Sequence, residues 1–208
     1  METIWREVRR ALLAAGYERP EMRARNAGAS IPLVHNAASR RPDLTGVFLV
    51  ADASTVDADL RQAVILIVRH NETGAIGVRL TGDTDPLPSE FSPEWRALVG
   101  EPSVVHDGGP VARDGFIAVA VLRPNATAPL RFTRIKGRLG TVSLSVAPST
   151  LRHKFYGVRI FCGYLGWGPG ELEAYLENRV LLTSTYPVRT LLSPNLKELW
   201  WSRPNNHH

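Results

Sequence analysis

The chain has 208 residues, of which 44% are hydrophobic and 22% are charged, a globular composition with enough apolar side chains for a full core. No apolar run approaches the ~20 residues that a membrane-spanning helix needs, because the longest, AVILIV at 63–68, has the length of a strand. The single cysteine, Cys162, excludes an internal disulfide and favours a reducing cytosol, and the formal net charge is +5.

Residues 2–16 have the pattern of an amphipathic helix that ends at Gly16. Its apolar stripe consists of Ile4, Val8, Leu12 and Ala15, with Arg6, Arg9 and Arg10 beside it. Because these arginines interrupt the apolar residues, this is not a secretion signal, and we expect a cytoplasmic protein without membrane association. Residues 18–45 are aperiodic and rich in proline and arginine. We therefore expect 1–43 to be an N-terminal helix and arm, appended to a domain at 44–202.

The predicted domain opens with a β-hairpin. Residues 46–52 have the pattern of a short buried strand, and residues 62–70 form a second strand that is too apolar to have a solvent face. The turn NETG at 71–74 then leads into a partner strand at 75–80.

A short helix is predicted at 91–100, because Ser92 is a suitable N-cap, Pro93 suits the first helical position and Gly100 ends the pattern. The later elements are strands at 103–111, 115–122, 140–146, 157–167 and 180–186, a helix at 169–179 and a final helical turn at 195–201. Strands and helices do not alternate regularly, and hairpins are present. This favours an α+β fold with a mostly antiparallel sheet over a doubly wound fold.

The segment GYLGWGPGELEAYL at 163–176 has the glycine content of a phosphate-binding loop. Such a loop needs free backbone N–H groups at a helix N-terminus. Here Pro169 has no N–H, and Glu171 and Glu173 place negative charge in the first turn, which repels phosphate. We therefore expect a steric corner between a strand and a helix, with Trp167 packed across it. Its glycines would be Gly163, Gly166, Gly168 and Gly170.

The segment HDGGPV at 106–111 pairs His106 with Asp107, but the other histidines are not at metal-ligand spacing. We expect no metal, and Asp107 is better explained as the cap of the turn that follows it. Cys162 falls on the inward face of a predicted strand and is expected to be a core residue. The chain has no G-x-S-x-G nucleophile motif, and no catalytic residue or cofactor is predicted.

Charge is unevenly distributed along the chain. Residues 115–170 contain no Asp or Glu, whereas residues 80–95 contain no Lys or Arg. Either the basic segment is a nucleic-acid-binding face, or the two segments lie side by side and neutralise each other. Alternating positions around 131–138 would project several bases from one strand face, and binding would be weak and salt-dependent. The candidate residues are Arg131, Arg134, Lys136, Arg138, Arg152 and Lys154.

Three stretches, HNETGAIGV at 70–78, GGPV at 108–111 and GYLGWGPGELE at 163–173, occur in this order and spacing in the AlgH/YqgE family. The chain resembles this family over roughly residues 44–200. The resemblance implies a small cytosolic bacterial protein without an established biochemical activity. It also implies an α+β fold with a bifurcated, partly barrel-like sheet surrounded by helices. One member is associated with the regulation of alginate production, which implies a role linked to transcription.

The chain departs from the family pattern at 80–83, where Leu-Thr-Gly-Asp replaces Leu-Asn-Arg-Pro, and at Glu171, which replaces Gln. We expect a non-enzymatic binding or regulatory module whose partner is an unidentified protein or a second copy of the chain. The alternative is a small-molecule binder or an enzyme with its site where the two glycine motifs meet. The residues proposed for that site are His70, Asn71, His106, Gly108, Gly109, Trp167 and Glu171.

Overall fold

The computed structural model describes residues 42–202. The predicted helix at 2–16 and most of the predicted arm lie outside these residues, so the N-terminal appendage and its boundary at residue 43 stay predictions. No helix in the described part of the chain is long and apolar enough to cross a membrane.

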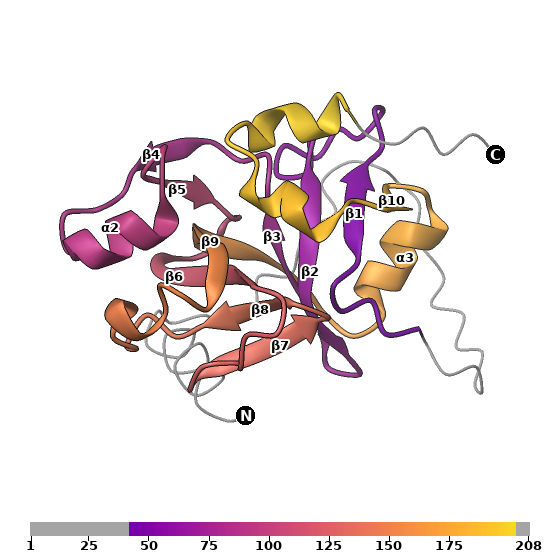
Figure 1. The fold of residues 1–208 in the computed structure, drawn as a ribbon. Coiled ribbons are helices and arrows are strands. Elements are labelled where there is room, and N and C mark those ends of the chain that lie inside the picture. The colour runs from indigo at the N-terminus through magenta and orange to yellow at the C-terminus, as the bar shows by residue number, and fades with distance from the viewer. Residues whose placement is uncertain (1–41, 203–208) are drawn as a thin grey trace. The chain divides into compact units, whose positions relative to one another are not determined.

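One sheet of ten strands dominates residues 42–202, and it curls into a half-barrel (Figure 1). Its strands are β1 (Phe48–Ala51), β2 (Val64–Asn71), β3 (Gly74–Arg79), β4 (Thr84–Pro86), β5 (Val104–Asp107), β6 (Val111–Leu122), β7 (Phe132–Lys136), β8 (Leu139–Val142), β9 (Phe155–Trp167) and β10 (Leu181–Ser184). Their order is β10-β1-β2-β3-β9-β6-β8-β7, with β5 paired to β9 and β4 paired to β5.

Strand β9 connects the two halves of this sheet. One edge of β9 pairs antiparallel with β6 between Phe155 and Tyr164. The other edge pairs first with β5, in parallel, around Phe161, and then with β3, antiparallel, from Leu165 to Trp167. The sheet therefore divides along this second edge of β9. The remaining pairs of the described strands are antiparallel, so the predicted mostly antiparallel, partly barrel-like sheet is confirmed.

Apolar side chains form separate cores around the two halves of β9. The first half packs with β5, β6 and helix α2 (Pro93–Val99), around Trp95, Phe155 and Ile160. The second half packs with β1, β2 and helix α3 (Glu171–Glu177), around Ile65, Trp167 and Leu172.

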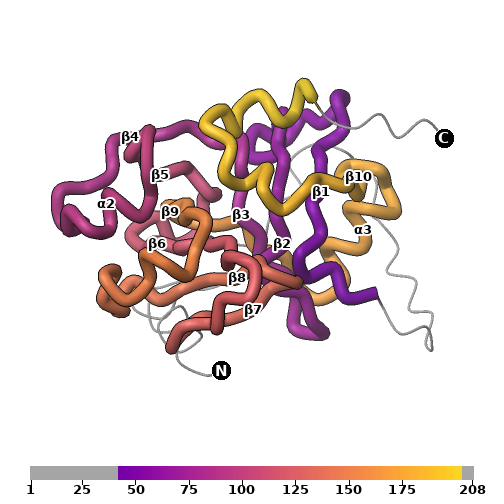
Figure 2. Tube along the Cα trace, viewed as in Figure 1, coloured from indigo at the N-terminus to yellow at the C-terminus, as the bar shows by residue number. Residues whose placement is uncertain are grey.

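The expectation that helices surround the sheet is wrong for the described residues. Their α-helices are α2 and α3, each seven residues long, and each lies on one of the two cores. The remaining helical turns are the short 3-10 helices η1 (Pro148–Thr150), η2 (Val188–Leu192) and η3 (Leu196–Trp200). Figure 2 shows η2 and η3, in yellow, along the upper ends of the strands. There the indole Nε1 of Trp200 donates a hydrogen bond to the Ala51 carbonyl at 3.2 Å.

Helix α2 forms as its sequence predicts. The hydroxyl of Ser92 accepts a hydrogen bond from the Trp95 N–H at 3.4 Å, and Pro93 occupies the first helical position. Gly100 ends the helix with a φ of 77°. The predicted hairpin is also present as β2 and β3, whereas the three-residue strand β4 was not predicted.

The predicted steric corner is shorter than expected, because β9 continues through Gly163 and Gly166 to Trp167. Gly163 is constrained by a different neighbour: its φ is +67°, and a Cβ built on it would lie 2.3 Å from the Gly109 carbonyl oxygen. A Cβ on Gly168 would be in ordinary van der Waals contact, with the Glu171 carboxylate 3.6 Å away. Of these two glycines, the fold therefore requires Gly163 and not Gly168.

We predict that Gly163→Ala lowers the free energy of unfolding by about 1–3 kcal/mol, because the added Cβ meets backbone and the φ is in the left-handed region. Gly168→Ala, five residues along the same segment, is the matched control and should change stability by no more than about 0.5 kcal/mol. Chemical denaturation of both variants is the measurement. Equal stability of the two variants would contradict the assignment of the constraint to Gly163.

Candidate functional site

His70 connects three parts of the chain. Its Nδ1 accepts the Leu44 N–H at 3.2 Å, and its Nε2 lies 3.4 Å from a carboxylate oxygen of Glu173. Because Nδ1 is an acceptor, the ring proton belongs on Nε2 and points to Glu173. The His70 side chain is only 5% exposed. It holds the first described residues and α3 against the end of β2.

Asn71, Trp167 and Glu171 are also engaged locally. The Asn71 side-chain oxygen accepts hydrogen bonds from the backbone and hydroxyl of Thr73, which shapes the hairpin turn. The Glu171 carboxylate accepts the Gly168 N–H at 2.7 Å, so it closes the turn before α3. Trp167 is buried in the second core. These contacts favour structural roles for the three residues.

The two glycine motifs do meet, as backbone against backbone. The Gly108 N–H donates to the Cys162 carbonyl at 2.8 Å, and a Cβ on Gly108 would lie 2.4 Å from the Gly163 carbonyl oxygen. A Cβ on Gly109 would lie 2.4 Å from the Tyr164 carbonyl. This contact is too close to hold a ligand between the two segments.

His106, in β5, and His70, in β2, lie level with different parts of β9. His106 is in register with Phe161. His70 is opposite Ala75, which is itself opposite Trp167. Six residues of strand, about 20 Å, separate these two points. The structure therefore does not bring the seven proposed ligand-site residues around one cavity.

His106 is a buried histidine, 4% exposed, and neither ring nitrogen has a hydrogen-bond partner in the described structure. Its ring lies 5.4 Å from that of Phe161. Burial, reinforced by the nearby positive charge of Arg159, lowers the pKa of His106 from 6.5 to about 4. His106 is consequently neutral at physiological pH.

Arg159 is a buried cation that binds backbone instead of a carboxylate. Its guanidinium donates to the carbonyls of Val99 at 3.0 Å and Leu192 at 2.9 Å. Val99 is the last residue of α2, where the helix dipole favours a positive charge. Arg159 therefore joins α2 and η2 to β9.

Asp107 caps the turn after β5, as predicted, by accepting the Gly109 N–H at 3.1 Å. It also pairs with Arg79 at 2.7 Å and with Arg113 at 3.6 Å. The nearby Cys162 thiol donates to the Arg113 carbonyl, and burial raises the pKa of this thiol. Residues 42–202 contain no group of three or more His, Cys, Asp or Glu side chains placed to hold a metal ion.

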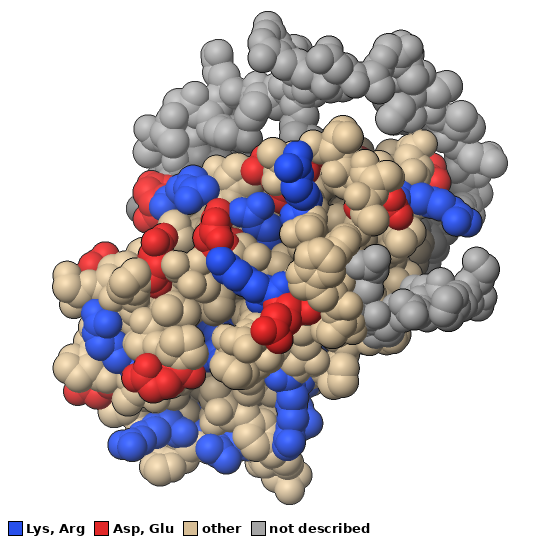
Figure 3. Space-filling view, turned by 90° about the horizontal axis from the view of Figure 1, so that it is seen from above, with Lys and Arg blue, Asp and Glu red and all other residues tan. Residues whose placement is uncertain are grey.

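The acidic and basic segments do not neutralise each other through ion pairs in the described structure. Asp83, in the acidic segment, pairs at 2.7 Å with Lys197, which lies outside the basic segment. None of the ion pairs formed within residues 42–202 joins 80–95 to 115–170. On the face seen in Figure 3, acidic and basic side chains are mixed, but bases project along its lower edge without acids between them.

Four of the predicted basic residues lie in or next to the edge strand β7, and the other two, Arg152 and Lys154, lie between η1 and β9. Only Arg134 and Lys136 are in the strand, and an irregularity in its pairing lies between them. Arg131 and Arg138 flank the strand, so the predicted single strand face is not formed. Five of the six candidates are exposed, Lys154 is half-buried, and none of the six forms an ion pair in the described residues.

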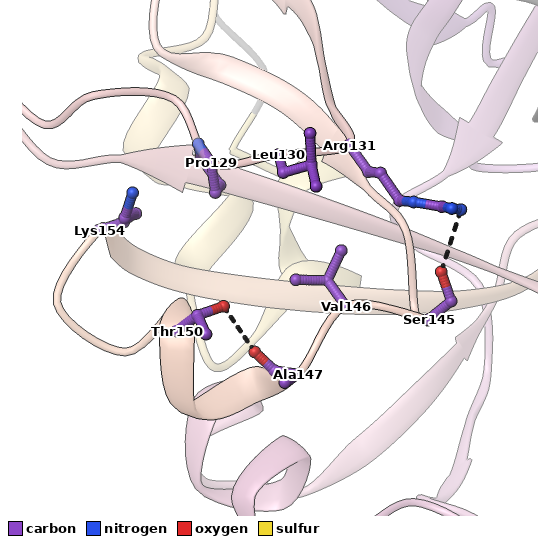
Figure 4. A pocket seen from close by; sticks show the side chains of 8 residues that line it. All are labelled: Pro129, Leu130, Arg131, Ser145, Val146, Ala147, Thr150 and Lys154. Carbon is purple, nitrogen blue, oxygen red and sulfur yellow. Dashed lines mark hydrogen bonds between the residues drawn. The ribbon is translucent and has the colours of Figure 1, made fainter.

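An open depression of about 410 Å³ lies between the loop before β7 and the segment before η1. Its apolar lining includes Leu130, which is 82% exposed, and Val146. Figure 4 shows Arg131 reaching toward Ser145, whose hydroxyl is 3.4 Å from Nη1, and Lys154 at the opposite side. Two of the predicted basic residues therefore border an apolar groove.

A second basic feature surrounds Tyr156 in β9. The guanidinium carbons of Arg123, Arg138 and Arg189 lie 5.1, 5.7 and 4.7 Å from the centre of its ring. Of these, only Arg138 was among the candidates. Arg123 could have been found from its place in the acid-free segment, but Arg189 lies outside that segment and is brought here by η2.

The family model described as AlgH-like matches residues 48–203. A UPF0301 protein of Streptomyces avermitilis is 38% identical over 160 residues, covering 76% of this chain and 83% of that protein. One from Mycobacterium tuberculosis is 34% identical over 174 residues, covering 81% and 85%.

Two solved structures have a similar fold. A crystal structure of a Corynebacterium diphtheriae protein aligns with a TM-score of 0.72 and 28% identity, covering 79% of this chain and 87% of that one. The solution structure of AlgH from Pseudomonas aeruginosa aligns with a TM-score of 0.58 and 23% identity, covering 79% and 89%. The second likeness is one of fold alone.

We predict that His106 makes the protein less stable in acid. Below pH 6.5 the unfolded chain binds a proton at this residue, whereas the folded chain does not until about pH 4. The free energy of unfolding therefore falls as the pH drops through this window, by about 3 kcal/mol in total. His106→Phe removes this contribution, and the exposed His153→Gln is the control. Denaturation above pH 6.5 and near pH 4 measures it; an unchanged pH dependence in His106→Phe would refute the assignment.

Proposed function

The chain belongs to the AlgH-like family, and we propose that it is a non-enzymatic, cytoplasmic binding module that recognises the backbone of a nucleic acid, with a role linked to transcription. The relatives are named only as UPF0301 proteins, so the proposal rests on the surface of this chain.

The observation that carries the proposal is the set of basic side chains on and beside β7. They project from a segment without Asp or Glu, and no described carboxylate pairs with them. Elsewhere in the described structure, Arg79 and Lys197 are each paired at 2.7 Å with a carboxylate. Unpaired bases gathered on one surface are the electrostatic signature of phosphate-backbone binding.

The groove beside β7 favours a nucleic acid, which has both bases and phosphates, over a partner that offers only charge. Its lining by Leu130 and Val146 offers apolar contact to the face of a base, while Arg131 and Lys154 border it with positive charge. A protein partner or self-association is the alternative occupant of this surface. For an enzyme or small-molecule binder centred on the two glycine motifs, the close backbone contact between Gly108 and Gly163 offers no support.

We predict that the protein binds oligonucleotides weakly, with a Kd in the range of about 10⁻⁴–10⁻⁶ M, and that affinity falls steeply as salt rises. Arg131→Glu combined with Lys154→Glu should weaken binding at least about tenfold at low salt and reduce the salt slope by about 1 for each lost contact. Fluorescence anisotropy with labelled single-stranded DNA, duplex DNA and single-stranded RNA measures both effects.

The matched control is Arg61→Glu combined with Arg179→Glu, which makes the same change in net charge. Both arginines are exposed, one before β2 and the other after α3. This control should bind much more tightly than the groove variant. Absence of binding at low salt, or equal loss in the two variants, would refute the proposal and direct the search to a protein partner.

A further inference from the structure

The arginines around Tyr156 form a second site, beside the groove. Arg123 follows β6, Arg138 lies between β7 and β8, Tyr156 is in β9 and Arg189 is in η2. Because each guanidinium carbon lies within 5.7 Å of the same ring centre, no two of them are farther apart than twice that distance. We propose that these three arginines and the Tyr156 hydroxyl bind a phosphate group, presented by the backbone of a single-stranded nucleic acid.

The hydrogen bonds within the cluster fix its side chains and leave donors available. Arg123 Nε donates to the Phe155 carbonyl at 3.0 Å, and its two terminal nitrogens form no hydrogen bond within residues 42–202. Arg189 Nη2 donates to the Tyr156 hydroxyl at 3.0 Å. Since that oxygen accepts from Arg189, its own hydrogen can be donated to a ligand. The guanidiniums offer only hydrogen-bond donors and no acceptor, which suits the binding of an oxyanion.

The electrostatics favour an anion as the missing partner. The three guanidiniums are exposed, and no described carboxylate lies within ion-pair distance of any of them. Their distances from the ring centre limit their separations to a range comparable with the screening length of about 8 Å at physiological salt, so they repel one another. The negative face of the tyrosine ring offsets part of this repulsion. A phosphate would offset more, because guanidinium forks match its oxygens in pairs.

The site is continuous with the groove, and its nucleic-acid source rests on the proposed function. The Arg123 N–H donates to the carbonyl of Lys154, and Lys154 borders the groove. Lys154 and Tyr156 are two residues apart, about 7 Å along the strand. A strand whose bases are not paired can therefore place a base in the groove while an adjacent phosphate reaches the arginines. A duplex cannot do this without unstacking, so we expect single strands to bind more tightly.

The first test uses inorganic pyrophosphate, which requires no nucleic acid. Titration calorimetry at constant ionic strength, with the arginine Nε–Hε resonances followed by NMR, should show saturable binding that shifts Arg123, Arg138 and Arg189. Arg123→Gln, Arg138→Gln and Arg189→Gln together should weaken binding about tenfold or more. Tyr156→Phe keeps the ring but removes the hydroxyl, and should weaken binding severalfold.

The matched control variant combines Arg61→Gln, Arg179→Gln and Lys197→Gln, which removes the same charge from other exposed positions. Thermal melting of all variants shows whether they are folded. Pyrophosphate binding that is equal in the cluster and control variants would overturn the site. So would shifts confined to other arginines.

The second test repeats the titration with single-stranded and duplex oligonucleotides. Weaker binding of single strands by the cluster variant than by the control supports the full proposal. If pyrophosphate binds at the cluster but no oligonucleotide binds, the nucleic-acid function is wrong and the site serves a free phosphate compound. If oligonucleotides bind equally to both variants, the nucleic-acid function stands and the proposed source of the phosphate is wrong.

Discussion

The fold depends on the close approach of backbones along β9. The turn at Gly108 and Gly109 lies directly on Gly163 and Tyr164, at separations that leave no space for a side chain. On the other side of the division in the sheet, Gly74 approaches the Trp167 carbonyl just as closely, since a Cβ there would lie 2.1 Å from that oxygen. These contacts let one strand hold β3, β5 and β6 at once. These contacts also explain why the three glycine-containing stretches of the sequence occur together, because all three meet along β9.

The close backbone packing along β9 explains why polar residues that resemble functional residues in the sequence have structural roles in the protein. His70 binds Leu44 and Glu173, Asp107 caps the turn that packs on Gly163, and Arg159 binds the ends of α2 and η2. Each forms polar contacts with neighbouring segments of the chain and holds those segments together. A buried or ion-paired polar residue can therefore be needed to hold a divided sheet together, and such a residue does not by itself indicate a catalytic site.

Local signals predicted local structure well, because their physical causes lie within a few residues. Ser92, Pro93 and Gly100 defined α2, and period and turn residues defined the β2–β3 hairpin. Contacts between distant segments could not be predicted in this way. Nothing near Gly163 in the sequence indicates that Gly109 will lie against it, so the sequence could not distinguish Gly163 from the other glycines of the predicted corner.

The basic surface also depends on contacts between segments that are distant in the sequence. The absence of Asp and Glu from 115–170 left two interpretations open, and no ion pair within the described residues joins this segment to 80–95. However, the arrangement around Tyr156 needs Arg189, which no property of that segment indicates.

Arginines are held in two ways in the described residues. One is held by backbone carbonyls, and three are held mainly by an aromatic ring. Arg159 is buried, and its guanidinium is bound by backbone carbonyls of α2 and η2, so burial is offset within the fold. Arg123, Arg138 and Arg189 are held mainly by the ring of Tyr156, which contacts the guanidiniums without using most of their N–H groups. The ring restricts their motion and so reduces the entropy that binding would cost. An arginine held in this way keeps most of its donors available, which supports the proposal that the Tyr156 cluster binds a phosphate group, whereas Arg159 stabilises the fold.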